Sequence, residues 1–381
     1  MNSRNAHTLA PAPRSLPLID SSRYPNGLRG VGQKLFSELA LRGFGAVAPG
    51  IRHPMPEPAL FSPYAESKIY GCTHYGIMIP DLPAPHHFLA CASIIGMPGM
   101  RVFDIDHAVD SDDGPRHTAT IAHGTAAAVD DGFRRYSMTR EMQLRDDGSL
   151  LQFGKDVTIS GTYPDYCLQS QREGFEVDLD LTATGDITWF SRSPIYNHIA
   201  LTTRYRGQIT LHGDAIPVSG LCTYEYARGI SLHLQRNRVI PAKFKLPWNF
   251  FTYQTIKLDD RTQLLLAHCR FFDYPGLTSA YLVTVGSGSV RLAGDTRFRV
   301  LELQEQPGVA PDGRETRLPK TFQWDIRDPQ GRSLFEINAT ADTPMLFGLG
   351  NGFIGGYRWE GTRDGAPASG RGYLEYVDQR G

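Results

Sequence analysis

The sequence lacks several features that would assign it at once to a common class of protein. No run of apolar residues reaches the roughly 18 that a transmembrane helix needs. Residues 1–26 contain no apolar stretch long enough for the core of a signal peptide. A phosphate-binding loop, a Gly-x-Ser-x-Gly elbow and a protein-kinase signature are absent as well. We therefore expect a cytoplasmic protein that has no membrane span and belongs to none of these enzyme classes.

An excess of charge of either sign is also absent. The chain has 39 Lys and Arg residues against 40 Asp and Glu residues, a formal net charge of −1. Because both signs are mixed along the chain, the overall charge attracts neither a nucleic acid nor an anionic membrane. We expect no nucleic-acid partner, and the sequence leaves the oligomeric state open.

Cysteine is scarce, and its spacing excludes the usual zinc and redox motifs. The five cysteines are widely spaced and form no Cys-x-x-Cys pair. They are Cys72, Cys91, Cys167, Cys222 and Cys269. Free buried thiols are the better interpretation, and they agree with a reducing compartment.

Histidine and aspartate offer one weak candidate for a metal site. His86 and His87 are adjacent, with His74, Asp104 and Asp106 nearby in the sequence. Neighbouring residues of a strand point to opposite faces, and no His-Glu-x-x-His spacing gathers these groups. The glycines from 350 to 355 spell a dinucleotide fingerprint, but a strand-like segment follows where a helix is required. We therefore expect no metal and no cofactor.

What the sequence does contain is a succession of strands. From residues 175 to 181, apolar and acidic residues alternate with the period of two that is typical of a half-buried antiparallel strand. Further strands are predicted over 201–211, 216–234, 250–258 and 263–272, with turns at Gly185-Asp186, Gly213-Asp214 and 259–261. Short strands joined by tight turns predict an all-β barrel or sandwich.

One short helix and two β-domains complete the predicted architecture. The helix covers residues 31–41, with Leu35, Phe36 and Leu39 on one stripe and Gly43 placed to end it. A chain of 381 residues exceeds the usual size of a single core. We predict an N-terminal extension and helix over 1–43, a first β-domain over 44–238 and a second over 239–381. The basic, proline-containing stretch 236–247 marks the boundary between the two β-domains.

Three segments of the sequence carry a family resemblance. They are YRGQITLHGDAIPVSGLCTYEYARG at 205–229, WNFFTYQTIKLDDRTQLLLAHCR at 248–270 and YRWEGTRDGAPASGRGYLEYVD at 357–378. In their order and pattern these segments resemble the lipocalin-like superfamily that includes AttH-type proteins and the carotenoid hydratases (hydroxyneurosporene synthase). The resemblance implies two lipocalin-like antiparallel β-barrels or half-barrels packed together. The segment HYGIMIPDLPAPHHF near the N-terminus suggests a separate bacterial branch of unknown function.

The resemblance also suggests a class of function. Its members include hydratases and cyclases, so we expect a cofactor-independent enzyme that acts on an apolar unsaturated small molecule such as a terpenoid or polyketide. Between residues 223 and 229 only Glu225 and Gly229 follow the superfamily pattern, so no particular hydratase mechanism carries over. The alternative is a carrier that binds a hydrophobic ligand without changing it.

Glu225 is the leading candidate for a catalytic group. A carboxylate in an apolar cavity gains affinity for a proton and becomes a general acid or base. The alternative for Glu225 is a structural ion pair. His268 and Arg270 share one face of a later strand and are further candidates, although a structural role for a lone strand histidine is the more common outcome.

Aromatic and cationic side chains are predicted to bind the ligand. The phenols of Tyr224 and Tyr226 and the guanidinium of Arg228 can donate hydrogen bonds to an oxygenated ligand. Aromatic residues supply the lining that apolar ligand pockets usually have. Each of them is equally suited to a core, and they are Trp248, Tyr253, Tyr357 and Trp359.

Overall fold

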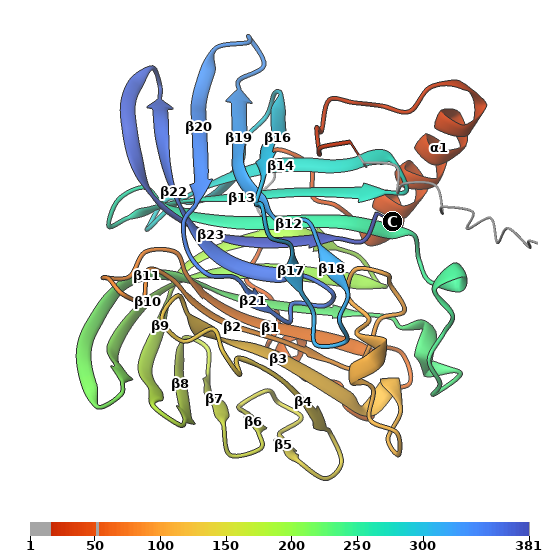
Figure 1. Cartoon of the computed structure of the whole chain (residues 1–381), viewed down its shortest axis with the longest axis vertical. Helices are drawn as coiled ribbons and strands as arrows, with labels where there is room; N and C mark the ends of the chain where they lie inside the picture. Colours follow the sequence, from red (N-terminus) through yellow and green to blue (C-terminus); the bar gives the residue numbers. More distant parts are fainter. Residues whose placement is uncertain (1–16, 51–52, 381) are drawn as a thin grey trace, which may run out of the picture.

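The computed structural model describes residues 17–50 and 53–380, which form two large antiparallel sheets and one long helix (Figure 1). The first sheet, in the lower half of Figure 1, has 11 strands and nearly closes into a barrel. The second sheet, in the upper half, has 10 strands and forms a half-barrel. The prediction of two packed lipocalin-like barrels or half-barrels with one N-terminal helix is confirmed.

The strands of the first sheet follow one another almost in chain order. They are β1 (Cys72–Ile79), β2 (Leu89–Ile95), β3 (Thr118–Thr125), β4 (Phe133–Ser137), β5 (Met142–Leu144), β6 (Leu150–Phe153), β7 (Val157–Thr162), β8 (Asp165–Arg172), β9 (Phe175–Arg192), β10 (Tyr196–Leu211) and β11 (Asp214–Gly229). The order in space is β4-β3-β2-β1-β11-β10-β9-β8-β7-β6-β5. Strand β11 therefore lies between β1 and β10, at the centre of the sheet.

The second sheet is built in the same way. Its strands are β12 (Trp248–Lys257), β13 (Thr262–Phe271), β14 (Tyr274–Thr284), β15 (Gly288–Arg291), β16 (Thr296–Leu303), β19 (Pro319–Arg327), β20 (Ser333–Ala341), β21 (Leu346–Phe347), β22 (Phe353–Arg363) and β23 (Ala366–Asp378). A small ribbon of β17 (Gly308–Val309) and β18 (Glu315–Thr316) stands apart. The central strands of the second sheet, β12 and β23, pair with each other.

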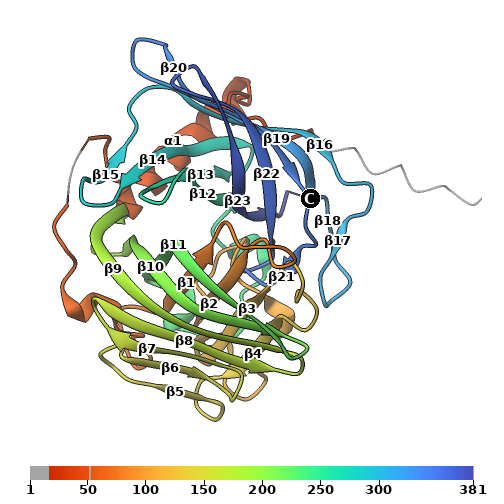
Figure 2. The same cartoon turned by 90° about the vertical axis from the view of Figure 1, so that its left-hand side faces the viewer.

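Three apolar clusters show how the two sheets pack. One fills the interior of the first barrel, with Tyr75, Leu168 and Tyr224 among its members. A second fills the concave side of the second sheet around Phe298 and Trp324. The third contains residues of both sheets, so it is the layer in which the sheets stack, as Figure 2 shows from the side. A functional site between the sheets would belong to this third layer.

A linker over residues 230–247 joins the two sheets. It contains two short 3-10 helices, η4 (Leu232–Leu234) and η5 (Ala242–Phe244). The boundary predicted at 236–247 falls within this linker, and the division into domains at 43 and 238 stays a prediction. Strand 216–234 was predicted too long, because β11 ends at Gly229 and the chain then turns into the linker.

Helix α1 (Gly27–Phe44) is longer than predicted, and the face that it buries differs from the predicted apolar stripe. Its last residue is Phe44, and Gly45, in the left-handed conformation (φ 70°), caps it. The predicted end at Gly43 is therefore slightly too early. The helix packs against β13, β14 and the end of β10. The buried residues are Gly30, Gln33 and Ser37, whereas Leu35 of the predicted apolar stripe is exposed. Phe36 of the same predicted stripe packs against Phe271 and Phe272, whereas Leu28, Leu35 and Leu39 face outwards.

One predicted turn is also wrong. Strand β9 continues through Gly185 and Asp186, where its pairing with β10 shifts in register between Leu201 and Thr203. Such an irregularity is a bulge, which bends a strand without reversing it. The turn at Gly213-Asp214 is confirmed, since it joins β10 to β11. Among the described residues, no helix is both long and apolar enough to cross a bilayer.

Candidate active site

Strand β11 has two faces, and the structure decides which of them meets the cavity. Tyr224 and Tyr226 point into the first barrel, where both are buried in its apolar core. Because side chains alternate along a strand, Thr223, Glu225 and Ala227 point the opposite way, towards the second sheet. The candidate carboxylate therefore lies between the two sheets and outside the barrel interior.

The register of the central strands surrounds Glu225 with two histidines. Its direct partners are a glycine on β1 and an alanine on β10, which leave room beside the carboxylate. One position further along the same face, Ala227 has His74 and His198 as its cross-strand partners. Diagonal neighbours on one face of a sheet lie within reach of long side chains. Both imidazoles therefore approach the same carboxylate from opposite strands.

The two carboxylate oxygens of Glu225 have different surroundings. Its Oε2 atom lies 3.1 Å from Nε2 of His198 and 3.9 Å from Nε2 of His74. Only 2% of the Glu225 side chain is exposed. The second oxygen, Oε1, is buried and makes no hydrogen bond within the described part of the chain. A buried acceptor without a partner is costly, so a ligand could donate a hydrogen bond to this atom. The Tyr253 phenol also interacts with the Glu225 side chain.

His74 is held in its neutral form. Nδ1 of His74 lies 2.8 Å from the carbonyl oxygen of Ser93 and donates its proton there, which leaves Nε2 as the basic nitrogen towards Glu225. Burial lowers the pKa of His74 to about 4, against the attraction of Glu225, which raises it, and with the repulsion of His198, which lowers it. At neutral pH this imidazole is therefore uncharged.

A second carboxylate enters the site from the other sheet. Glu375 on β23 pairs in register with Tyr253 on β12, so the two side chains emerge side by side. The Tyr373 phenol donates a hydrogen bond of 2.9 Å to Oε1 of Glu375. Glu375 is 3% exposed and lines the same cavity as Glu225.

The surroundings of Glu375 favour the protonated form of its carboxyl group. Burial raises the pKa of Glu375 well above its ordinary value, and the charge of Glu225 raises it further, while the Tyr373 hydrogen bond acts in the opposite direction. Burial and the same Glu225 charge also raise the pKa of the Tyr253 phenol. Glu375 therefore carries a proton when Glu225 is ionised.

The walls of the cavity are otherwise largely apolar. Phe190 packs against the ring of His198 with centroids 4.7 Å apart and against Tyr253 and Tyr281 at 5.7 and 5.1 Å. Other apolar wall residues come from α1, the loops and the second sheet, and include Phe44, Met100, Trp248, Phe251 and Phe271. An apolar cavity with a few convergent polar groups is typical of a small-molecule site.

The three residues predicted to be catalytic lie in different environments. Glu225 is in the cavity. His268 also touches the cavity wall, but its ring packs against Phe250 and Phe298 in the second core, and burial lowers its pKa to about 3. Arg270 is not among the residues that line the cavity, and its guanidinium donates to the carbonyl oxygens of Asp20 and Asp273. The structure therefore brings neither His268 nor Arg270 to Glu225.

The predicted ligand-binding residues separate in the same way. Trp248 and Tyr253 line the cavity, and Arg228 borders it while its guanidinium stacks on the ring of Tyr70. The other four are core residues. Tyr224 and Tyr226 belong to the first core, and Tyr357 and Trp359 to the second.

Sequence reasoning missed Glu375 and His198 and considered His74 only as a metal ligand. Glu375 stands in the segment Tyr-Leu-Glu-Tyr-Val, where one ionisable residue interrupts an otherwise apolar strand. This is the same signal that drew attention to Glu225. The position of His198 gave no comparable signal, because only the register of β10 against β11 places it at the carboxylate.

The residues considered for a metal do not gather. His86 contacts the hydroxyl of Thr125, and Asp104 binds His233 and Lys245 at 3.1 and 3.0 Å. Among the residues that the structure describes, no three metal-ligating side chains are grouped so that they could hold an ion.

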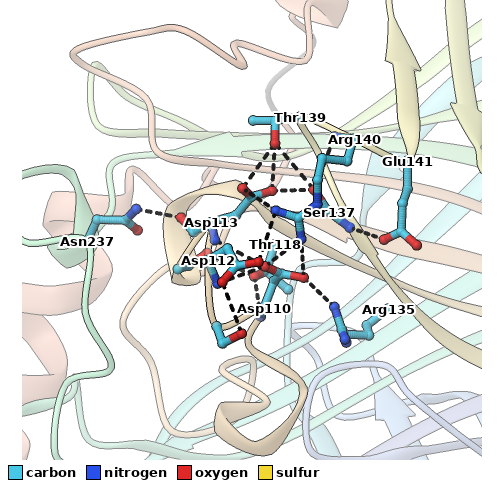
Figure 3. Close-up of polar contacts among 12 residues, drawn as sticks. Asp110, Asp112, Asp113, Thr118, Arg135, Ser137, Thr139, Arg140, Glu141 and Asn237 are labelled. Atoms are coloured by element: carbon cyan, nitrogen blue, oxygen red, sulfur yellow. Dashed lines mark hydrogen bonds and ion pairs between the residues drawn. The ribbon is translucent and has the colours of Figure 1, made fainter.

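A cluster of polar contacts lies outside this cavity. Asp110 accepts hydrogen bonds from Arg135 and Arg140, and Asp113 accepts from Ser137 and Thr139 (Figure 3). Arg140 also forms ion pairs with both carboxylates, so the cluster ties a loop to β4 and the residues after it. We assign it a structural role.

Fold and site together define the class of this protein. It is a lipocalin-like β protein in which two stacked sheets enclose an apolar cavity, and each sheet contributes one buried glutamate. The chain belongs to a family of unknown function, DUF6670, whose model matches residues 92–381.

Solved structures agree with the fold. A crystal structure assigned as an AttH protein from Nitrosomonas europaea covers 87% of this chain and 99% of its own, at 14% identity and a TM-score of 0.56. CghA covers 89% of this chain and 97% of its own, at 10% identity and a TM-score of 0.47. At 14% identity, the likeness to the AttH structure concerns the fold alone. No curated protein matches the chain.

Proposed function

We propose that this protein is a cofactor-independent enzyme that moves a proton to and from an apolar unsaturated small molecule, such as a terpenoid or polyketide. The observation that carries the proposal is the pair of glutamates, one from each sheet, that share a dry cavity. Like charges in such a site oppose simultaneous ionisation, so one carboxyl keeps its proton while the other stays ionised. The pair can therefore supply an acid and a base together.

The residues take separate roles in this scheme. Glu375, whose pKa is raised, donates its proton to a double bond or carbonyl of the ligand. The C–H or O–H bond that forms leaves a cation on the ligand, and the apolar walls keep bulk water away from it. Glu225 then accepts a proton from the adjacent carbon, or from a water molecule that adds to the cation. His198, at 3.1 Å, steadies the carboxylate that does so.

The proton balance closes within the pair. An isomerisation or cyclisation takes one proton from Glu375 and returns one to Glu225, and a hydration adds the elements of water. Because both carboxyls line one cavity, the proton then returns from Glu225 to Glu375 for the next turnover. The Tyr373 phenol, which donates to Glu375, orients the carboxyl during these steps.

The largely apolar walls also suit a carrier, which is the second candidate function. Such walls hold a hydrophobic ligand by area alone, without any chemistry. The carrier does not require an ionisable pair, whereas the enzyme does. Variants of the two glutamates therefore separate the candidates.

The test begins with the ligand that the protein selects. Protein purified from its source is extracted, the extracted compounds are identified by mass spectrometry, and each is returned to fresh protein and followed over time. Conversion that fails with a Glu225→Gln and a Glu375→Gln variant supports the enzyme. Recovery of compounds that bind to both variants and never change contradicts the enzyme and supports the carrier.

A further inference from the structure

Helix α1 has the reverse of the usual arrangement for a surface helix. An amphipathic helix buries its apolar stripe and exposes its polar side. In α1 the buried positions are taken by glycine, glutamine and serine. Its exposed stripe is formed by large apolar residues at spacings of three and four, with exposed fractions from 59% to 93%: Leu28, Val31, Leu35 and Leu39. Nothing in the described structure covers this stripe.

The linker between the sheets, like α1, exposes large apolar side chains. Four of its apolar side chains are exposed, namely Ile230, Leu232, Val239 and Phe244. No acidic residue occurs between Glu225 and Asp259. The exposed cations in this stretch are Arg236, Arg238 and Lys243. The near-zero charge of the whole chain thus conceals a local excess of positive charge.

Both segments reach the cavity. Leu41 and Phe44 at the end of α1 form part of its wall, and so does Ile230 at the start of the linker. Among the described residues that line the cavity, Ile230 is the only exposed one. Both segments lie at the right-hand end of the molecule in Figure 1 and at its far side in Figure 2. The cavity therefore opens at the end where these apolar and basic residues gather.

The linker is held in place and presents these side chains in a fixed arrangement. The Asn237 amide donates to the carbonyl oxygen of Asp113 (Figure 3). Its side-chain oxygen accepts from the backbone N–H of Arg116. Lys245, buried below the surface, binds Asp104 and Asp106. The contacts of Asn237 and Lys245 therefore hold the exposed side chains of the linker in a defined arrangement on the protein surface.

We propose that this end of the molecule, formed by the exposed apolar and basic residues of α1 and of the linker 230–247, docks on the surface of an anionic lipid bilayer. We call it the entrance face. Leucine and phenylalanine side chains insert at the level of the headgroups, and nearby lysines and arginines attract anionic lipids. Arg42 of α1 adds a further exposed cation near the cavity end of the helix, whereas Arg29 and Lys34 are paired with Asp273 and Glu38.

Docking in this position would bring the open end of the cavity to the membrane. An apolar ligand could then pass between bilayer and cavity without crossing water. That passage rests on the proposed function, whereas the docking itself does not. A protein that binds vesicles but converts nothing would therefore refute the enzyme and leave the docking surface intact.

Vesicle co-sedimentation tests the docking. The full-length protein is mixed with vesicles of phosphatidylcholine alone or with about a third phosphatidylglycerol, at low and high salt. We expect binding to the anionic vesicles that weakens as salt rises. The double substitution Leu35→Asn/Leu39→Asn should lower the partition coefficient about ten-fold. The matched control is Leu301→Asn/Val309→Asn, which alters one exposed apolar residue of β16 and one of the small β17–β18 ribbon and should bind as the parent does.

Other occupants of the stripe give different results. A second copy of the chain would appear in sedimentation velocity as a dimer that Leu35→Asn/Leu39→Asn dissolves. Residues 1–16 would be the occupant if vesicle binding appeared only after their deletion. Either outcome, or an equal binding of the stripe and control variants, overturns the proposal. Circular dichroism of each variant verifies that its fold is intact.

Discussion

Glu225 of β11 and Glu375 of β23 come from different sheets, and the negative charge of the first raises the pKa of the second. Neither strand alone creates this relationship. Both carboxyls are buried in the layer between the sheets, so the protonation of Glu375 depends on the charge of Glu225. The predictions below follow from this pair and from the residues that surround it.

Replacing Glu375 by glutamine should abolish most of the activity. Glu375→Gln keeps the shape of the side chain and an oxygen that accepts from Tyr373, but it removes the transferable proton. Turnover should fall by roughly 100-fold or more, the usual scale of general acid–base catalysis. Ligand affinity should hardly change. Steady-state kinetics and equilibrium binding on the same preparation measure both.

Glu225→Gln should give a similar loss of turnover, and the double variant should lose little more than either single one, because the two residues act as a unit. Glu360→Gln is the matched control, since Glu360 is exposed on β22. Losses that multiply in the double variant would show that the two carboxyls act independently.

The raised pKa of Glu375 predicts how stability depends on pH. The folded protein holds this proton more tightly than the unfolded chain, whose Glu has an ordinary pKa of 4.5. The stabilisation is therefore complete below that value and is lost as pH rises through the folded-state pKa. Glu375→Gln removes this loss. The free energy of unfolding of the variant, minus that of the parent, should increase between about pH 5 and about pH 8 in urea titrations.

His74 contributes in the opposite direction and equally in both proteins. Its pKa is lowered to about 4 by burial, so its stabilisation is present above pH 6.5 and is lost as pH falls through 4. Nuclear magnetic resonance titration of the imidazole should show this. A stability difference between parent and variant that stays constant with pH would contradict the assignment of a raised pKa to Glu375.

Tyr253, which lines the cavity, and Tyr226, which lies in the core of the first barrel, should respond differently to the loss of their hydroxyl groups. Tyr253→Phe changes the cavity next to both carboxylates and should lower turnover by about ten-fold. Tyr226→Phe removes a hydrogen bond of 2.8 Å to the carbonyl oxygen of Ser62 outside the cavity. It should cost about 1 kcal/mol of stability and leave turnover unchanged. Equal effects of both on turnover would mean that the Tyr226 face also matters to the ligand.

Arg270 should prove structural. Its guanidinium joins β13 to the backbone of Asp20 and Asp273, at a distance from the cavity lining. Arg270→Lys keeps the charge but loses part of this bonding pattern, so the free energy of unfolding should fall by about 1–3 kcal/mol. Turnover per folded molecule should stay as in the parent. A large fall in turnover with unchanged thermal stability would restore Arg270 as a catalytic candidate.

Local patterns in the sequence predicted the elements that depend on neighbouring residues. The alternation over 175–181 indicated a strand, and a strand is found there as part of β9. The same reasoning failed at Gly185, because a glycine followed by an aspartate serves equally for a turn and for a bulge. It also failed on the orientation of α1, where Gly30 and Ser37 are buried and Leu35 is exposed.

The sequence by itself determined that this chain is a β protein with two sheets and with an ionisable residue, Glu225, on an otherwise uncharged face. Period-two alternation and turn residues are local properties, so they can be recognised in the string. Only the tertiary structure decided that this face looks towards the second sheet, that His198 and His74 meet the carboxylate, and that Glu375 stands in the same cavity. The reason is that strand register and sheet stacking join residues 150 positions apart, and no local pattern encodes such a distance.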